Sequence, residues 1–389
     1  MNLRERIARR QRTEHEPRLV HDYDAVNPVV HPDEPTGRGP VLEQLLDHIE
    51  PVFDGVLPPS FYIWGPKGTG KSAVVTALFA QLRDLSGRPR SVILTTTRAK
   101  PPQPTEFVYL DARDAASDFA LSHAVLDALV EESVPKHGVG TAELRSRLQE
   151  ELTNGDRRVL LAVDHLDEPE THSFGAVEGI FSPVEDSLTL VGIGRARPAE
   201  TDADVSAVRF PPYRHHALVD ILTSRVSNGL ARHALTHEQV REVAEWADGD
   251  AHDALAALFG AADQAMVAGH NSVSTADLDA GMDAVPRPCV SLGRVLALPA
   301  NRQRVLRRLL DLNDDERSSV QEASEHISRT VDLSAATVKR ILYELAESGI
   351  TRRVTIEEAE GKGRPPSRLE PRFPTAVFKR LFALDGGRE

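Results

Sequence analysis

The sequence is poor in several residue types, and each shortage excludes a class of structure. The 389 residues contain one cysteine, Cys289, which excludes an intramolecular disulfide framework and a cysteine-based zinc site. No run of 18 apolar residues occurs, which excludes a membrane-spanning helix. Residues 1–18 lack the apolar segment of a secretory signal. We therefore expect a cytoplasmic protein that contacts no membrane.

Lysine is also scarce, with seven lysines against 39 arginines in a chain of net charge −13. An acidic, arginine-rich surface stays hydrated in concentrated salt, so the composition favours a halophilic host. A GC-rich genome also replaces lysine by arginine, but it does not explain the acid excess. Residues 299–389 carry a net charge of +2 and the rest carries −15. This difference indicates an anionic partner for the C-terminal part.

Short apolar runs alternate with helical patterns as far as residue 212, which predicts an α/β domain with a parallel sheet. Strands are expected at residues 61–64, 107–110, 159–163, 188–193 and 208–210. The strand signal then disappears, and four helical patterns predict an all-helical lid: residues 213–230, 236–247, 251–268 and 274–284. The predicted organisation is a basic arm (1–20), a nucleotide-binding domain (21–212), the lid (213–285) and a C-terminal domain (296–382).

A phosphate-binding loop follows the first predicted strand and precedes an amphipathic helix, the context that the G-x-x-x-x-G-K-[ST] pattern requires. Its glycines allow backbone N–H groups to surround phosphate oxygens, and the helix N-terminus adds its dipole. The lysine would reach the β and γ phosphates of ATP or ADP, and the serine would bind Mg²⁺. The candidate residues are Gly65, Pro66, Lys67, Gly68, Thr69, Gly70, Lys71 and Ser72.

A second metal ligand is expected at Asp164, where the strand at residues 159–163 ends. An aspartate in this Walker B position holds Mg²⁺ together with the serine of the phosphate loop. The alternative is an aspartate that caps a turn. Hydrolytic enzymes of this kind place a glutamate next, but this chain has His165. Because histidine is a poorer base beside Mg²⁺, we expect slow or absent hydrolysis.

The C-terminal part has the pattern of a winged helix-turn-helix, with helices expected at residues 301–312 and 319–330. A third helix begins after Ser334, buries one apolar stripe, and ends at Gly349. Such a helix enters the DNA major groove, and a wing between strands 352–356 and 367–370 contacts the minor groove. The candidate DNA-binding residues are Thr337, Lys339, Arg340, Lys362, Gly363, Arg364 and Arg368. Protein contact is the alternative use of this domain.

The order of phosphate loop, Walker B strand, lid and winged helix resembles the AAA+ class of ATPases. More narrowly, it is similar to the archaeal replication initiators related to the origin recognition complex large subunit and the cell-division-cycle loader. The most specific stretches are residues 61–72, 208–225, 249–268 and 299–373. The resemblance implies nucleotide contacts by Tyr213 and Arg225 and binding of double-stranded origin DNA in the nucleoid. It also implies possible recruitment of a replicative helicase, by a monomer or by an assembly on DNA.

The chain departs from that family at the positions that sense and hydrolyse nucleotide. Arg195 stands where the family has a sensor asparagine, and His252 stands where a lid arginine touches the γ-phosphate. Residues 199–207 lack the arginine that serves a neighbouring subunit. Together with His165, these changes favour a nucleotide switch with weak or absent hydrolysis. An alignment offset of one or two residues near Arg195 would weaken that interpretation.

Two other functions remain open on the sequence. The altered catalytic positions are compatible with a nucleotide-sensing transcription regulator that acts at promoters. An active AAA+ ATPase whose winged helix binds protein is the second alternative. Turnover measurements separate the enzyme from the two DNA binders, and DNA footprints separate the binders from each other.

Overall fold

The computed structural model describes residues 19–86, 105–154, 157–355 and 367–385. The predicted basic arm therefore lies almost entirely outside the described residues, as do Lys362, Gly363 and Arg364 at the predicted wing tip. Among the described helices, none has the length and apolar character needed to cross a membrane.

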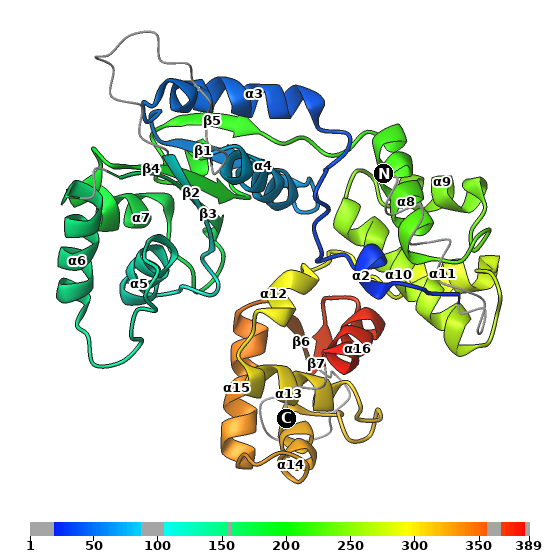
Figure 1. Cartoon of the computed structure of the whole chain (residues 1–389). Helices are drawn as coiled ribbons and strands as arrows, with labels where there is room; N and C mark the ends of the chain where they lie inside the picture. Colours follow the sequence, from blue (N-terminus) through cyan, green and yellow to red (C-terminus); the bar gives the residue numbers. More distant parts are fainter. Residues whose placement is uncertain (1–18, 87–104, 155–156, 356–366, 386–389) are drawn as a thin grey trace.

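A five-stranded parallel sheet forms the centre of the N-terminal domain, as the alternating pattern predicts (Figure 1). The strand order is β2-β3-β4-β1-β5. Because all strands are parallel, their carboxyl ends meet at one edge, where ligands bind in open α/β sheets. The strands are β1 (Phe61–Trp64), β2 (Thr105–Asp111), β3 (Arg158–Leu166), β4 (Leu188–Gly194) and β5 (Ser206–Arg209).

Helices cover both faces of the sheet, and each face has its own apolar cluster. One face packs against α3 (Gly39–Ile49) and α4 (Lys71–Ser86). The other face packs against α5 (Asp118–Leu129), α6 (Thr141–Asn154) and α7 (Phe174–Phe181). Helix α7 was not predicted from the sequence. Shorter helical elements are α2 (Tyr23–Val26), η1 (Glu50–Asp54), η2 (Ser182–Val184) and η3 (Pro198–Glu200).

Four helices follow the sheet, as predicted: α8 (His215–Gly229), α9 (His237–Trp246), α10 (Ala251–Val267) and α11 (Thr275–Asp283). Helix α10 is rich in alanine and buried on most of its surface, so it is the central helix of this bundle. Small residues let α10 and α11 approach closely. A Cβ atom added at Gly281 would lie 2.5 Å from the carbonyl oxygen of Ala257.

In the described C-terminal part, three of the five helices and an antiparallel hairpin have the arrangement of a winged helix-turn-helix. The third helix begins as predicted, with the Ser334 hydroxyl accepting a hydrogen bond from the Thr337 N–H. The elements are α12 (Leu292–Leu296), α13 (Ala300–Leu309), α14 (Val320–Ser328), α15 (Ala335–Glu347), β6 (Thr351–Thr355), β7 (Ser367–Pro371) and α16 (Thr375–Leu384).

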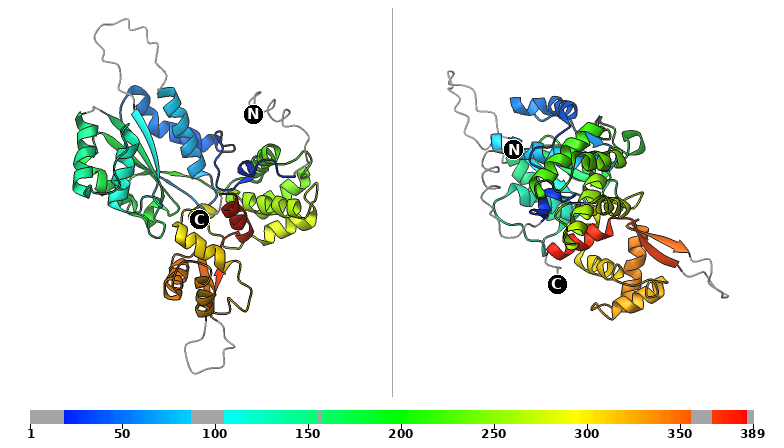
Figure 2. Two further views of the ribbon diagram at one scale, coloured as in Figure 1. Left: turned by 60° about the horizontal axis from the view of Figure 1, so that its bottom comes forward. Right: turned by 90° about the vertical axis from the view of Figure 1, so that its right-hand side faces the viewer.

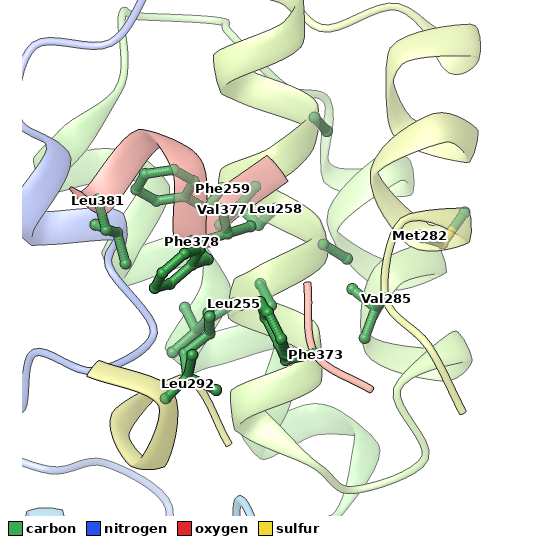
Figure 3. Packing of buried hydrophobic residues seen from close by; sticks show 14 of the residues in the cluster. Leu255, Leu258, Phe259, Met282, Val285, Leu292, Phe373, Val377, Phe378 and Leu381 are labelled. Carbon is green, nitrogen blue, oxygen red and sulfur yellow. The ribbon is translucent and has the colours of Figure 1, made fainter. Parts of the chain in front are cut away.

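Helix α16, which the sequence pattern did not predict, returns to the lid and joins it to the winged helix (Figure 2). Phe373 and Phe378 pack among Leu255, Phe259 and Leu292 in one continuous apolar cluster (Figure 3). The Phe373 and Phe378 rings meet edge to face, with centroids 5.4 Å apart. The lid and the winged helix therefore share one hydrophobic core.

We expect the substitution Phe378→Ala to destabilise this shared unit by about 3–5 kcal/mol, because it removes a fully buried ring and leaves a cavity. The measurement is denaturant unfolding of the full chain in concentrated salt, followed by circular dichroism. Leu384→Ala is the matched control on the same helix, because Leu384 is exposed and its truncation should change stability by less than about 0.5 kcal/mol. If the two substitutions lower the free energy of unfolding equally, the lid and the winged helix do not share a core around Phe378.

Candidate nucleotide-binding site

A cleft of about 1180 Å³ lies at the carboxyl edge of the sheet. The phosphate loop forms its floor, and the segment at residues 28–36 and the lid form its walls. Ser291 and Gly293, which lead into the winged helix, also line this cleft. Its wall therefore contains residues from the sheet domain, the lid and the connection to the winged helix.

The phosphate loop needs glycine at two positions because of its conformation and its close contacts. Gly68 has φ 69° and Gly70 has φ 79°, in the region that side chains rarely adopt. A Cβ atom at Gly68 would lie 1.9 Å from Asp250 Oδ1, and one at Gly70 would lie 2.2 Å from Tyr213 Oη. The lid therefore packs directly on the loop that would hold phosphate.

Lys71 carries the buried ammonium group of the cleft. Its Nζ donates to the carbonyl oxygens of Gly65 at 2.7 Å and Pro66 at 2.9 Å. Burial lowers the pKa of Lys71 to about 8, because these neutral carbonyls compensate the charge only in part. A buried cation beside a loop of N–H donors fits the phosphates of a nucleotide.

Asp164 lies at the end of β3 and is almost completely buried. Its Oδ2 accepts a hydrogen bond from Tyr109 Oη at 2.6 Å, and its Oδ1 accepts one from the His165 N–H at 2.6 Å. Asp164 lines the same cleft as Ser72, which belongs to the first turn of α4. A carboxylate and a hydroxyl in this arrangement fit the oxygen ligands that Mg²⁺ prefers.

His165 lines the cleft and lies beside Asp111, with His165 Nδ1 3.1 Å from Asp111 Oδ1. Burial opposes ionisation of Asp111, but contacts from His165 and Arg113 outweigh it and hold the pKa of this carboxyl well below its usual range. This carboxylate orients the imidazole through Nδ1.

Lys67, the second lysine of the phosphate loop, binds the N-terminal end of α10. Its ammonium lies 2.6 Å from Asp250 Oδ2 and 2.5 Å from Asp253 Oδ1. Burial disfavours this charge, but the two carboxylates outweigh burial and raise the pKa of Lys67. His252, Asp253 and Cys289 have the spacing of a metal site, yet Lys67 already supplies the positive charge there.

His252 connects the lid to the start of the winged-helix part. Its Nε2 accepts a hydrogen bond of 2.9 Å from the Leu292 N–H, at the first residue of α12. Burial lowers the pKa of His252, so the ring is neutral at pH 7. With Nε2 as acceptor, the proton lies on Nδ1, 3.1 Å from Asp253 Oδ1. A neutral ring cannot provide the charge that the resemblance assigns to a lid arginine.

Tyr213 and Arg225, the two further residues predicted to contact nucleotide, both line the cleft. The Arg38 guanidinium stacks on the Tyr213 ring, 3.5 Å from its centroid, and holds the ring against the phosphate loop. Arg225 donates to the carbonyl oxygens of Ala25 at 3.1 Å and Val30 at 2.6 Å. These bonds fix the N-terminal segment against α8.

Sequence reasoning missed Glu168, which belongs to the irregular segment that follows β3. Its side chain is only 6% exposed, lines the cleft, and places Oε1 3.0 Å from Arg195 Nη2. Arg195 follows β4, the strand beside β3. The acidic run after Asp164 was visible in the sequence, but no periodicity indicates which of its carboxylates turns inward.

The candidate DNA-binding residues of the described part gather on α15 and β7. Thr337 lies in the first turn of α15. The Lys339 ammonium lies 2.7 Å from Gln321 Oε1, and Arg340 pairs with Glu344 at 2.5 Å. Arg368 is exposed on β7, 2.9 Å from Glu370 Oε1. Exposed pairs of this kind are weak, so these cations are available to a polyanion.

Comparisons with known proteins agree with this geometry. Residues 34–193 match the family model of the AAA ATPase domain. ORC1-type DNA replication protein 9 of Halobacterium salinarum is 28% identical over 264 residues, which are 64% of this chain and 66% of that protein. ORC1-type DNA replication protein 1 of Methanothermobacter thermautotrophicus is 24% identical over 359 residues, 86% of this chain and 88% of that protein. The matches to the first two relatives span 66% and 60% of those relatives' lengths.

Solved structures show the same fold over nearly the whole chain. The Aeropyrum pernix ORC1 protein, solved in complex with DNA, has a TM-score of 0.62 and 21% identity, and covers 96% of this chain and 98% of its own. Cdc6p of Pyrobaculum aerophilum has a TM-score of 0.56 and 18% identity, with 94% and 99% covered. Relatives from Halobacterium salinarum and Haloarcula marismortui agree with the halophilic composition. The match to the AAA ATPase domain includes the phosphate loop and Asp164, so the cleft is a candidate nucleotide-binding site.

Proposed function

We propose that this chain is an ATP-binding replication initiator, because it contains a match to the AAA ATPase domain and is similar to ORC1-type DNA replication proteins. In this proposal it binds double-stranded origin DNA in the cytoplasmic nucleoid, and the bound nucleotide controls that binding. It acts as a monomer or assembles on DNA, and a replicative helicase is a possible partner.

One observation carries the proposal: the segment that leads into the winged helix forms part of the nucleotide cleft. Ser291, the N-terminal cap of α12, and Gly293, in the first turn of α12, both line the cleft. The bond from the Leu292 N–H to His252 attaches the same segment to the lid. A nucleotide in this cleft would therefore lie beside the connection to the DNA-reading domain, which supports a switch.

The nucleotide and its metal would be held by residues with distinct tasks. Backbone N–H groups at positions 65–70 and the Lys71 ammonium would bind the phosphates, and Ser72 and Asp164 would bind Mg²⁺. Bound Mg²⁺ neutralises phosphate charge. Tyr213 would hold the lid against the phosphate loop, and Arg225 would hold the N-terminal segment at the cleft.

We propose that hydrolysis is weak, because His165 stands in place of the glutamate that orients the attacking water, and because His252 is neutral. The test is a turnover measurement with the full chain, Mg²⁺ and ATP, combined with footprinting on genomic fragments of the host. The proposal expects slow turnover and nucleotide-dependent footprints at replication start sites. A rate above about 1 s⁻¹ would indicate an ordinary enzyme. Footprints confined to promoters would indicate a transcription regulator.

The affinity for ATP should depend on pH through Lys71. In the free protein, the ammonium loses its proton as the pH rises through about 8, whereas bound phosphate would keep it charged. We therefore expect the dissociation constant for ATP to rise about tenfold between pH 7 and pH 9, with proton uptake on binding. Calorimetry in two buffers of different ionisation enthalpy measures both. A constant affinity without proton uptake would contradict the depressed pKa of Lys71.

A further inference from the structure

The segment after Asp164 has an unusual backbone that turns one carboxylate inward. His165, Asp167 and Glu170 have φ values of 62°, 61° and 71°, a region that non-glycine residues rarely adopt. Backbone of this kind persists where the surrounding structure enforces it, and it gathers at functional sites. Between these residues, the Glu168 side chain enters the protein and reaches the nucleotide cleft.

Glu168 lies between two arginines that belong to different parts of the molecule. Arg195, at the end of β4, lines the nucleotide cleft, and its Nη2 lies 3.0 Å from Glu168 Oε1. Arg294, in α12, has its Nε 3.9 Å from Glu168 Oε2. The Arg195 side chain is 39% exposed, whereas that of Arg294 is 14% exposed. The cleft-side arginine is therefore the freer of the two.

Arg294 also reaches the helix that would read DNA. Its Nη2 donates a hydrogen bond of 2.5 Å to the carbonyl oxygen of Ser348, the C-terminal cap of α15. Arginine at a helix C-terminus is held by the free carbonyls and by the helix dipole. A chain of three contacts thus runs from Arg195 through Glu168 and Arg294 to the end of α15.

A second arginine makes a parallel connection. Arg302 in α13 has its Nη1 3.3 Å from Glu170 Oε2 and its Nη2 3.1 Å from Glu344 Oε2 in α15. Glu170 belongs to the same segment as Glu168. The segment that follows Asp164 is therefore joined to α15 at two places, so a displacement of one element would also displace the other.

We propose that Glu168 is a positioning residue that transmits the occupancy of the γ-phosphate end of the cleft to α15. With ATP bound, Arg195 would turn from Glu168 toward the additional phosphate charge. The buried carboxylate then requires another cation, because an uncompensated buried charge is costly. Of the two arginines that pair with Glu168, Arg294 is the one that remains, and its approach would draw α12 and the end of α15 toward the sheet domain. With ADP bound, Arg195 keeps Glu168.

This coupling through Arg195, Glu168 and Arg294, called the relay below, rests on the proposed function, because it assumes that the cleft binds ATP and ADP. Hydrogen–deuterium exchange of the full chain tests it without any need for hydrolysis or DNA. The two states are the protein saturated with ADP and the protein saturated with adenylyl imidodiphosphate, a non-hydrolysable ATP analogue. We expect the analogue to slow exchange in α12 and the last turns of α15 by about two- to fivefold, the size of one partly exposed ion pair.

Two substitutions should each remove this difference, one by leaving exchange fast in both states and the other by leaving it slow in both. Glu168→Gln should bind both nucleotides yet exchange equally fast with each, because Arg294 loses its charged partner. Arg195→Gln should exchange slowly even with ADP, because Glu168 is then left to Arg294. The Arg195 side chain is partly exposed, so this variant tests the relay even if the buried Glu168→Gln change prevents folding. The matched controls are Glu178→Gln and Arg304→Gln, at exposed positions of α7 and α13.

The relay is overturned if Glu168→Gln keeps the full wild-type difference, or if Arg195→Gln with ADP exchanges as fast as the wild type with ADP. Absence of any nucleotide-dependent exchange in the wild type overturns it as well. DNA binding, measured separately by fluorescence anisotropy, distinguishes this failure from failure of the proposed function. If the exchange results support the relay but the protein binds no DNA, the proposed initiator function is refuted and the relay is not. Nucleotide-dependent DNA binding that Glu168→Gln leaves unchanged would refute only the relay.

Discussion

Replacement of Lys71 by alanine is expected to weaken ATP binding by about 30-fold or more. The Lys71 ammonium is the buried cation beside the phosphate loop, and its partners in the structure are the neutral carbonyls of Gly65 and Pro66. A hydrogen bond to a charged group contributes about 1.5–3 kcal/mol, which corresponds to roughly 10- to 150-fold in affinity. The measurement is the dissociation constant of a fluorescent ATP analogue in the presence of Mg²⁺.

The same substitution should leave the fold intact or stabilise it slightly, because it removes a buried charge that neutral groups compensate only in part. Thermal unfolding with and without ATP checks both effects, since ATP should raise the melting temperature of the wild type and not of the variant. Lys136→Ala, at an exposed position outside the cleft, is the matched control. If Lys71→Ala binds ATP as tightly as the wild type, the phosphate loop is not where the phosphates of ATP bind.

The double substitution Lys339→Ala with Arg340→Ala is expected to weaken binding to double-stranded DNA by about 10- to 100-fold. Both side chains lie on α15, and their present partners, Gln321 and Glu344, hold them only weakly. Removal of one base or phosphate interaction of a recognition helix costs on the order of 1–3 kcal/mol. Fluorescence anisotropy with a labelled duplex, repeated over a range of salt concentrations, measures the decrease in affinity.

The salt dependence shows whether the two residues contact phosphates or bases. If both contact phosphates, the slope of log affinity against log salt should become less steep by about 1.8, since each phosphate interaction contributes about 0.9. Arg304→Gln, on the neighbouring helix α13, is the control for a change of net charge. If the double variant binds DNA as well as the wild type, α15 is not the DNA-reading helix, and a protein partner becomes the better interpretation of the winged helix.

Features set by local sequence could be predicted. The phosphate loop is contiguous, so its glycines, Lys71 and Ser72 identify the cleft from the sequence alone. The buried stripe of α15 and its Ser334 cap likewise follow from the spacing of neighbouring residues. The prediction of a parallel sheet was confirmed because alternating strands and helices leave few other arrangements.

Features that depend on distant contacts could not be predicted. Helix α16 packs on a lid helix more than 100 residues earlier, and no local pattern specifies that partner. Lys67 looked like a phosphate ligand, yet its charge pairs with Asp250 and Asp253 of the lid. Glu168 turns inward only because of an irregular backbone between His165 and Glu170. These residues connect domains, and the connection exists only in the folded chain.

In the proposed function, nucleotide binding and DNA binding are coupled at replication origins. The most direct measurement is a genome-wide map of the protein on the host chromosome, compared with replication start sites from marker-frequency sequencing. We expect occupancy peaks at a replication start site in the wild type, and their loss in a Lys71→Ala strain that makes normal amounts of protein. Peaks at promoters with none at a replication start site, or origin peaks that persist in the Lys71→Ala strain, would contradict the account.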